Sequence, residues 1–272
     1  YRPKPTERLS YLSHRTTLQV LETVGMAKAT PRVLQAALAH GCRQDGAGRL
    51  RFPAVVVEAC LRTAAKSFTV HGRNPALDFE ARNGMVNFAT GGAAVTMLDR
   101  RTRSYRPSVL SDLYDLARVA TELSNIQWFA RLVVATDVTD NFDLDVNTIY
   151  AYAAIGIGMP IHSQTGPQAG ATAPAALAGT LVQVCAEGLA SLCVINMLAP
   201  GHPVVMGNWA FTSDLRTGAF TGGGGEAALL GAASGQMSAF HVIPPAAVKA
   251  AHPLLSTHGL FGAAHTPTDG HV

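Results

Sequence analysis

The chain has 272 residues, of which 14% are charged and 48% hydrophobic, and its formal net charge is +3. Ordinary soluble domains carry about 25% charged residues, so this composition excludes a disordered tail and a charged scaffold. The length suits one large α/β or barrel domain as well as two smaller ones. The charge also argues against nucleic acid, since the one basic cluster (Arg100, Arg101, Arg103 and Arg106) has no aromatic stacking platform beside it.

The charged residues are distributed unevenly along the chain. Residues 151–272 contain only six of them: Glu187, Asp214, Arg216, Glu226, Lys249 and Asp269. A stretch so poor in charge is mostly interior or is covered by another surface. A homo-oligomer is therefore one expectation, although the interior of a barrel gives the same pattern.

The cysteines and the lengths of the apolar runs indicate the cellular compartment of the protein. The four cysteines, Cys42, Cys60, Cys185 and Cys193, form no CxxC pair, which is typical of buried thiols in a reducing compartment. No uninterrupted apolar run reaches the about 18 residues of a membrane span, and no signal-peptide pattern is visible. We expect a cytoplasmic protein that does not interact with a membrane.

The first 107 residues predict a domain of helices followed by short strands. Helices are expected at 6–27, from Pro31 and after Pro53, where apolar residues recur with helical spacing. The period then changes, and short β-like runs favour a small antiparallel hairpin layer. These runs are 67–70, 77–80, 85–89 and 95–98.

Residues 108–245 predict a repeated alternation of helix and strand. A helical stripe runs from Leu113 to Leu123. The elements expected after it are a strand at 126–135, a helix at about 145–156, a strand at 159–165, a long apolar helix from Pro174 to about Leu198, a strand at 203–208 and a helix at 226–240. Successive strand–helix units indicate a parallel sheet or a βα barrel. Residues 246–272 show no periodicity and form an unassigned tail.

The candidate site follows from the carboxyl ends of the predicted strands, where chemistry takes place in such folds. These ends are Thr136-Asp137, Gln164-Thr165 and Asn208-Trp209. Beyond the last of them, two aromatic residues and a carboxylate lie close in sequence, a combination that holds quaternary ammonium groups. The candidate substrate-binding residues are Gln164, Thr165, Asn208, Trp209, Phe211, Asp214, Arg216 and Glu226. A loop ion pair between Asp214 and Arg216 that caps a barrel is an equally good interpretation.

Other motifs give weaker signals, and no catalytic residue is assigned from any of them. The glycine-rich stretch 221–226 precedes a helix and could bind an anion, but it lacks the Lys-Ser/Thr of a P-loop. His162, His202 and His241 lack metal-ligand spacing, so structural histidines are favoured and no metal is predicted. Glu187 is the single charge of the long apolar helix and must be paired or neutral. A structural pair with a backbone group or an arginine is favoured for it.

A series of short motifs spread over residues 15–245 carries a family resemblance. In order they are Leu21–Gly25, Arg51–Pro53, Phe68–Pro75, Thr90–Gly92, Asp112-Leu113, Leu123–Ile126, Gly170–Gly179, Ala186–Ala190, Pro200-Gly201, Asp214–Gly218 and Gly225-Glu226. The most specific is Gly170–Gly179, GATAPAALAG. Each motif alone is weak, but their number and order resemble the trimethylamine methyltransferase family, which includes corrinoid-dependent glycine betaine methyltransferases. We expect the branch without pyrrolysine, although the position of pyrrolysine falls in the part of the family pattern that is not recognisable here.

The resemblance implies a fold and an activity. The fold class is α/β: a TIM-type (βα) barrel, or part of one, preceded by an N-terminal helical and small antiparallel β region. The implied activity moves a methyl group from a small quaternary or tertiary amine, with glycine betaine as the best candidate, to the cobalt of a corrinoid (cobalamin) on a partner protein. No cofactor is bound directly. Family members are longer, the segment 145–158 is shorter than theirs, and their last barrel units are not recognisable after Pro245.

Two further hypotheses remain. The chain could be a non-catalytic protein that binds a betaine-like ligand or a partner, as a remnant of a barrel. It could also be a lyase or another barrel enzyme that uses the glycine-rich loop for a phosphate group.

Overall fold

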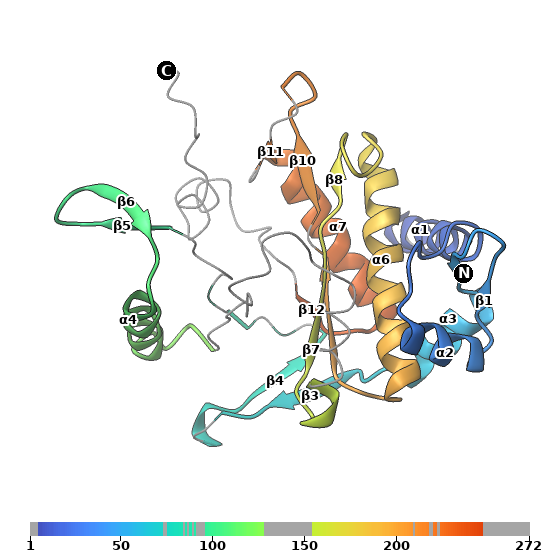
Figure 1. The fold of residues 1–272 in the computed structure, drawn as a ribbon, viewed down its shortest axis with the longest axis horizontal. Helices are drawn as coiled ribbons and strands as arrows, with labels where there is room; N and C mark the ends of the chain where they lie inside the picture. The colour runs from blue at the N-terminus through green and yellow to red at the C-terminus, as the bar shows by residue number, and fades with distance from the viewer. Residues whose placement is uncertain are drawn as a thin grey trace. The chain divides into compact units, whose positions relative to one another are not determined.

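In the computed structural model (Figure 1), the residues described are 5–72, 75–83, 85, 87–88, 90, 96–127, 154–208, 210–217, 220–221 and 224–246. They divide into two compact units. The first is drawn from Tyr1–Val70, Glu80–Gly84 and Phe142–Ala250, and the second from His71–Phe79, Met85–Asn141 and Ala251–Val272. The candidate site falls in the first unit.

The three predicted N-terminal helices are confirmed as α1 (Pro5–Thr23), α2 (Pro31–Ala39) and α3 (Ala54–Thr63). Helix α2 begins as its sequence predicts, because the Thr30 side chain accepts the Val33 N–H at 3.5 Å and Pro31 fills the first position. Helix α1 ends earlier than predicted. Gly25 has a φ of +59°, and a Cβ there would lie 2.1 Å from the Leu50 carbonyl oxygen, so only glycine permits this close turn.

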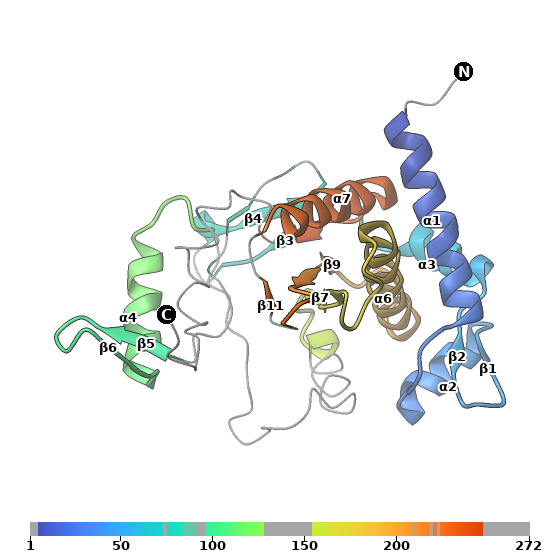
Figure 2. The same ribbon diagram turned by 90° about the horizontal axis from the view of Figure 1, so that it is seen from above.

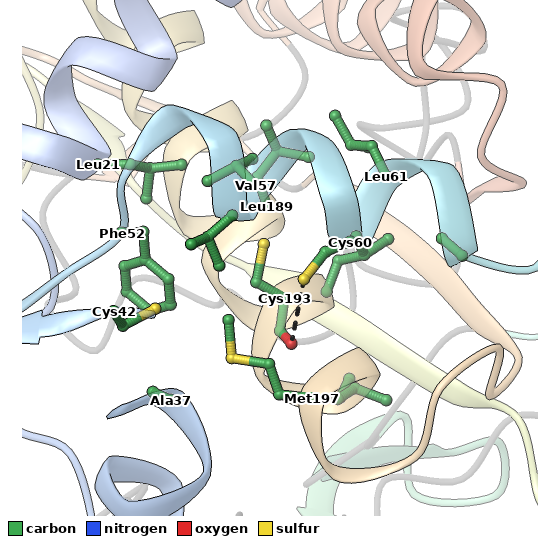
Figure 3. Close-up of a cluster of buried hydrophobic side chains, with 14 of the residues drawn as sticks. Leu21, Ala37, Cys42, Phe52, Val57, Cys60, Leu61, Leu189, Cys193 and Met197 are labelled. Carbon is green, nitrogen blue, oxygen red and sulfur yellow. Dashed lines mark hydrogen bonds between the residues drawn. The ribbon is translucent and has the colours of Figure 1, made fainter. Parts of the chain in front are cut away.

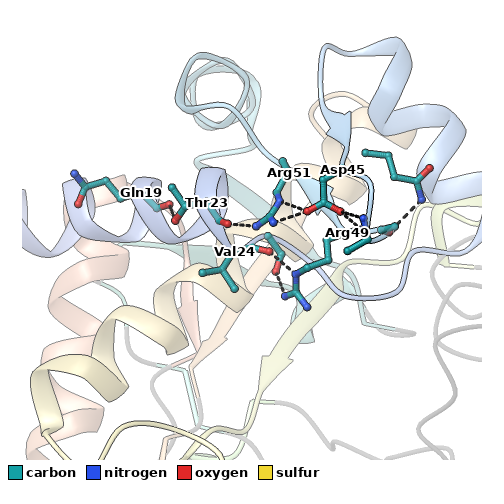
Figure 4. Close-up of polar contacts among 10 residues, drawn as sticks. Gln19, Thr23, Val24, Asp45, Arg49 and Arg51 are labelled. Atoms are coloured by element: carbon teal, nitrogen blue, oxygen red, sulfur yellow. Dashed lines mark hydrogen bonds and ion pairs between the residues drawn. The ribbon is translucent and has the colours of Figure 1, made fainter.

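A short hairpin, β1 (Arg43–Gln44) and β2 (Leu50–Arg51), closes the end of α1. Figure 4 shows the contacts: Arg49 donates from Nε to the Val24 carbonyl at 2.6 Å and from Nη2 to the Gly25 carbonyl at 2.9 Å. Arg51 donates to the Thr23 carbonyl and to Asp45. These bonds satisfy helix-end carbonyls that would otherwise lack partners. The Arg49 N–H and the Arg51 side chain also hold the pKa of Asp45 below its usual value.

Helix α6 (Leu177–Leu198) is the centre of the first unit. It lies between the N-terminal helices and the parallel strands described below (Figures 1 and 2). Leu189, Leu192 and Cys193 are fully buried in a cluster that also includes Phe52 and Val57 (Figure 3). The prediction of buried thiols is confirmed, since all four cysteines are buried and free. The helix begins at Leu177 and not at Pro174, because the Pro174 carbonyl lies in the preceding loop and accepts the Thr180 hydroxyl at 2.7 Å.

By length and composition α6 could also cross a membrane, and it is the one such helix among the described residues. In this structure it contacts α1, α2 and α3 on one side and strands and α7 on another. A core helix that is apolar almost all round gives the same composition.

A parallel sheet confirms the predicted strand–helix alternation. Its strands β7 (Ile161–Thr165), β9 (Val204–Asn208) and β12 (Pro245–Ala246) lie in the order β12-β9-β7. Helix α6 connects β7 to β9, and α7 (Gly225–His241) connects β9 to β12. The register pairs Ile161 with Val204 and Thr165 with Asn208. No closed barrel exists among the described residues, so α/β is the class that is confirmed and the TIM-type barrel stays an expectation.

A second small sheet was not predicted. Its order is β11 (Phe220–Thr221), β10 (Phe211–Ser213) and β8 (Gln168–Ala169). Strand β10 is parallel to β8 and antiparallel to β11. These strands of two or three residues are too short to leave a periodic signal in the sequence.

The predicted hairpin layer is present in part. Strands β5 (Thr96–Asp99) and β6 (Ser104–Pro107) form an antiparallel hairpin, and β3 (Ser67–Val70) pairs with β4 (Phe79–Arg82). Helix α4 (Leu110–Thr121) follows as predicted. Arg106 of the basic cluster makes two bonds of 2.7 Å to Asp112 and holds the pKa of this carboxyl at about 2. This arginine therefore stabilises the start of α4.

Several predicted elements lie outside the described residues. These are nearly all of the strand at 126–135, most of the helix at 145–156, part of the run at 85–89 and most of the tail 246–272. The strand end Thr136-Asp137 lies outside them as well.

Candidate functional site

The carboxyl ends of β7 and β9 lie side by side, as expected for neighbouring parallel strands. Thr165 is paired with Asn208 and Gln164 with Gly207. Thr165 is buried, and its hydroxyl donates to the Gly207 carbonyl at 3.5 Å. Three of the predicted site residues, Gln164, Thr165 and Asn208, are thus brought to one edge of the sheet.

Phe211 lies beside the same edge. It opens β10, and its N–H donates to the Pro167 carbonyl at 2.9 Å. A Cβ on Gly166, the residue that follows β7, would lie 3.6 Å from Cε2 of the Phe211 ring. The ring is therefore packed against the chain where β7 ends. Trp209, the other aromatic residue predicted for this site, lies outside the described residues.

Asp214 and Arg216 form an ion pair in the loop after β10. The Asp214 carboxylate accepts the Arg216 backbone N–H at 2.9 Å and the guanidinium nitrogens at 3.2 and 3.1 Å. These bonds lower the pKa of Asp214, so it is ionised at neutral pH. The Arg216 side chain is 88% exposed and the Asp214 side chain 24%. The loop ion pair, which the sequence offered as an alternative interpretation, is therefore present. In this geometry the Arg216 guanidinium neutralises the charge of Asp214.

The most specific family motif, Gly170–Gly179, contacts another of the motifs, Asp214–Gly218. Gly170 has a φ of +84°, and a Cβ there would lie 2.2 Å from Cδ2 of Leu215, the residue between Asp214 and Arg216. The Gln168 carbonyl accepts the N–H groups of Ala171, Thr172 and Ala173 at 2.9 to 3.0 Å. Gly170 therefore permits both the tight turn after β8 and the close packing of the Asp214 loop. The motif residues build the loop that flanks the strand ends.

The remainder of the motif attaches this loop to α6. A Cβ on Gly179 would lie 2.9 Å from Cβ of Pro174, so glycine is needed where the loop passes over the helix. The Gln183 amide donates to the Thr172 carbonyl at 3.1 Å and to Glu187 at 2.9 Å. Glu187 is thus paired, as predicted, but with an amide side chain and not with an arginine or a backbone group. Partial desolvation raises its pKa.

Glu226 lies in the first turn of α7, where the glycine-rich loop ends. A Cβ on Gly224 would lie 3.3 Å from its Oε2, so the carboxylate lies close to the helix N-terminus. A negative side chain complements the helix dipole there and competes with an external anion. This placement disfavours a phosphate at the end of the loop, although Gly222 and Gly223 lie outside the described residues.

Two of the three singled-out histidines are structural, as predicted. His202 is buried, and its Nε2 donates to the Met159 carbonyl at 2.9 Å. His241 Nε2 lies 3.0 Å from Nδ1 of His14, whose Nε2 donates to Glu58 at 2.8 Å. No group of three or more His, Cys, Asp or Glu residues that could hold a metal occurs in the described ranges.

His162, the third singled-out histidine, lies on the same strand as the predicted site residues Gln164 and Thr165. It lies on β7 between Ile161 and Ser163 and is exposed on the sheet, two residues before Gln164. Strand alternation in the predicted run 159–165 already separates His162 from the buried face of Ser163 and Thr165. The alternation therefore indicates from the sequence alone that His162 lies on the opposite face of the strand. The spacing of the histidines bears only on metal binding.

Comparisons with known proteins identify the family of this chain. The family described as trimethylamine methyltransferase (MTTB) matches residues 1–168 and 146–252. Trimethylamine methyltransferase MttB of Methanosarcina thermophila is 24% identical over 298 residues, which cover 85% of this chain and 62% of the relative. Glycine betaine methyltransferase of Desulfitobacterium hafniense (strain Y51) is 25% identical over 295 residues, 85% of this chain and 61% of the relative. The chain spans about 60% of the length of these curated relatives. By the extent of the family match, it belongs to the trimethylamine methyltransferase family.

Proposed function

We propose that this protein is a methyltransferase that moves a methyl group from a small quaternary or tertiary amine, with glycine betaine as the best candidate, to the cobalt of a corrinoid protein. The observation that carries the proposal is the family match, which extends over the N-terminal helices and the parallel sheet. Relatives named for trimethylamine and for glycine betaine support the substrate class. A cytoplasmic location and assembly with a second copy are parts of the same proposal.

The reaction breaks a C–N bond whose electron pair stays on nitrogen, while carbon forms a bond to the acceptor. When bound, the partner's corrinoid supplies a strongly nucleophilic metal as that acceptor. The role of this chain is then to bind the amine, orient the N–CH3 bond in line with the acceptor and exclude water. None of these tasks needs a general base.

The groups at the strand ends suit such a cation. The Phe211 ring offers a π face, and Asp214 is ionised. Because the Arg216 guanidinium pairs with Asp214 but is highly exposed, it can move away when a cationic substrate arrives. We assign Gln164, Thr165, Asn208, Trp209 and Glu226 to the surroundings of the substrate.

The test mixes the purified protein, a corrinoid protein in its Co(I) state and glycine betaine, and follows the visible spectrum. We expect the spectrum of methylcob(III)alamin to appear, in proportion to the betaine added. Carnitine, trimethylamine and dimethylamine are tested in parallel. If the folded protein gives no methylated product with any of them, the proposal is wrong.

Two further measurements distinguish the proposed methyltransferase from the two alternative functions. Calorimetry that detects betaine binding while no methyl transfer occurs would identify a ligand-binding protein. If phosphate esters protect the protein against unfolding and betaines do not, the protein is instead a barrel enzyme that binds phosphate.

A further inference from the structure

The parallel sheet has two different faces near its carboxyl edge. Ser163 and Thr165 of β7 are buried with Val204 and Met206 of β9, on the face that α6 and α7 cover. His162 alternates with them and extends from the opposite face, where it is exposed. In the βα barrel that the family implies, this face leads to the ligand site at the carboxyl ends of the strands.

The imidazole of His162 rests on a glycine of the neighbouring strand. A Cβ on Gly207 would lie 2.0 Å from Nε2 and 2.5 Å from Cδ2 of His162, and 2.9 Å from the Ser163 carbonyl oxygen. Any other residue at position 207 would displace the ring. Gly207 thus provides the space that the Nε2 and Cδ2 atoms of this histidine occupy.

His162 also differs in its hydrogen bonding from the other histidines that the structure describes. His14, His40, His71, His202 and His241 each make a hydrogen bond. Within the part of the chain that the structure describes, His162 makes none. A polar ring that is held in place without a partner is available to a ligand. Desolvation by the surrounding protein lowers the pKa of His162 although part of the ring is exposed, so the ring is neutral at neutral pH.

We propose that His162 donates a hydrogen bond to the carboxylate of a zwitterionic methylated amine, and that the site thereby prefers betaines to simple methylamines. This inference rests on the proposed function. Asp214 follows β10, whose first residue Phe211 packs where β7 ends, and Glu226 lies in the first turn of α7. We therefore place the ammonium group at the edge and the substrate carboxylate farther back along β7. The His162 ring lies there, because it reaches Gly207, which pairs with Gln164 one residue before the end of β7. A neutral ring donates an N–H without repelling the ammonium group.

The test compares two ligands that share a cation and differ in the carboxylate. Binding of glycine betaine and of tetramethylammonium to the full chain is measured by calorimetry for the wild type, His162→Leu and His162→Gln. Leucine removes the donor at similar size, and glutamine keeps an amide donor. We expect His162→Leu to weaken betaine binding about 10- to 100-fold, the range for a hydrogen bond to a charged group. Tetramethylammonium binding should be unchanged, and His162→Gln should restore most of the betaine affinity.

Arg216→Gln is the matched control, because this exposed guanidinium in the loop after β10 is a rival partner for a carboxylate. If Arg216→Gln loses betaine affinity and His162→Leu does not, the inference is overturned. It is also overturned if His162→Leu weakens both ligands equally, which indicates a loss of shape only. If the His162→Leu variant transfers methyl groups from betaine with an unchanged KM, this inference is rejected and the proposed function is not affected. A folded wild type that binds neither ligand and transfers no methyl group would overturn both.

Discussion

The hydrophobic cluster around α6 and the carboxyl edge of the parallel sheet are built in opposite ways. In the cluster, Leu189, Leu192 and Phe52 are completely enclosed by their neighbours (Figure 3). At the edge, Asp214 and Arg216 pair in solvent, His162 has no hydrogen bond, and the buried hydroxyls of Ser163 and Ser213 have no partner among the described residues. The difference predicts that stability and the proposed ligand binding reside in separate parts of the same unit, which substitutions can separate.

The largest expected effect is in the cluster. Leu189→Ala should lower the free energy of unfolding by about 2–5 kcal/mol, because it removes buried methyl groups and leaves a cavity. Urea denaturation measures this loss, and ligand affinity per folded molecule should be unchanged. Val55→Ala is the control, since its side chain on α3 is 71% exposed and its loss should be within about 0.5 kcal/mol. Equal losses for the two variants would mean that α6 is not the centre of the core.

The histidine pair that links α1 and α7 predicts acid sensitivity. His241 is buried beside His14 and near Lys66, and burial is the main cause that lowers its pKa to about 3. Since the unfolded state takes up a proton near pH 6.5 and the folded state does not, stability is full above about pH 6.5. It should fall by up to about 1.4 kcal/mol per pH unit as the pH drops toward 3.

Denaturation midpoints between pH 7 and pH 4 measure this effect. His241→Phe, which keeps an aromatic ring but cannot be protonated, should flatten the dependence. A slope that persists in this variant would assign the acid sensitivity to other groups.

An intermediate effect is expected where the two family motifs meet. Gly170→Ala should cost about 2 kcal/mol, because alanine is strained at a φ of +84° and its Cβ overlaps Leu215. The double variant with Leu215→Ala should recover the part due to overlap but not the part due to strain. If the double-mutant cycle shows no coupling energy, the contact between residues 170 and 215 does not contribute to the loss of stability.

The smallest effect on stability belongs to the exposed ion pair. Arg216→Gln should change the free energy of unfolding by less than about 1 kcal/mol, as is usual for pairs open to solvent. Binding of tetramethylammonium should tighten several-fold in this variant, because the Asp214 carboxylate is uncovered. Unchanged cation affinity would remove Asp214 from the binding site.

The sequence alone was enough for the elements with long, regular patterns. Helical periodicity predicted α1, α2, α3, α4, α6 and α7, and the strand–helix alternation predicted that β7 and β9 would be parallel. Their carboxyl ends followed, which is why Gln164, Thr165 and Asn208 were predicted together. These features depend on spacing within a segment, and a sequence shows such spacing directly.

Only the tertiary structure decided which distant residues touch. The contact of Leu215 with Gly170, the packing of Phe211 at Gly166 and the position of His162 over Gly207 each join residues about 45 positions apart. Such pairs depend on strand register and on loops that no periodicity describes. The sequence by itself therefore determined the family and the order of helices and strands. The structure alone placed His162 on the face of the sheet opposite the helices, because Gly207 on the neighbouring strand has no side chain and makes room for the ring.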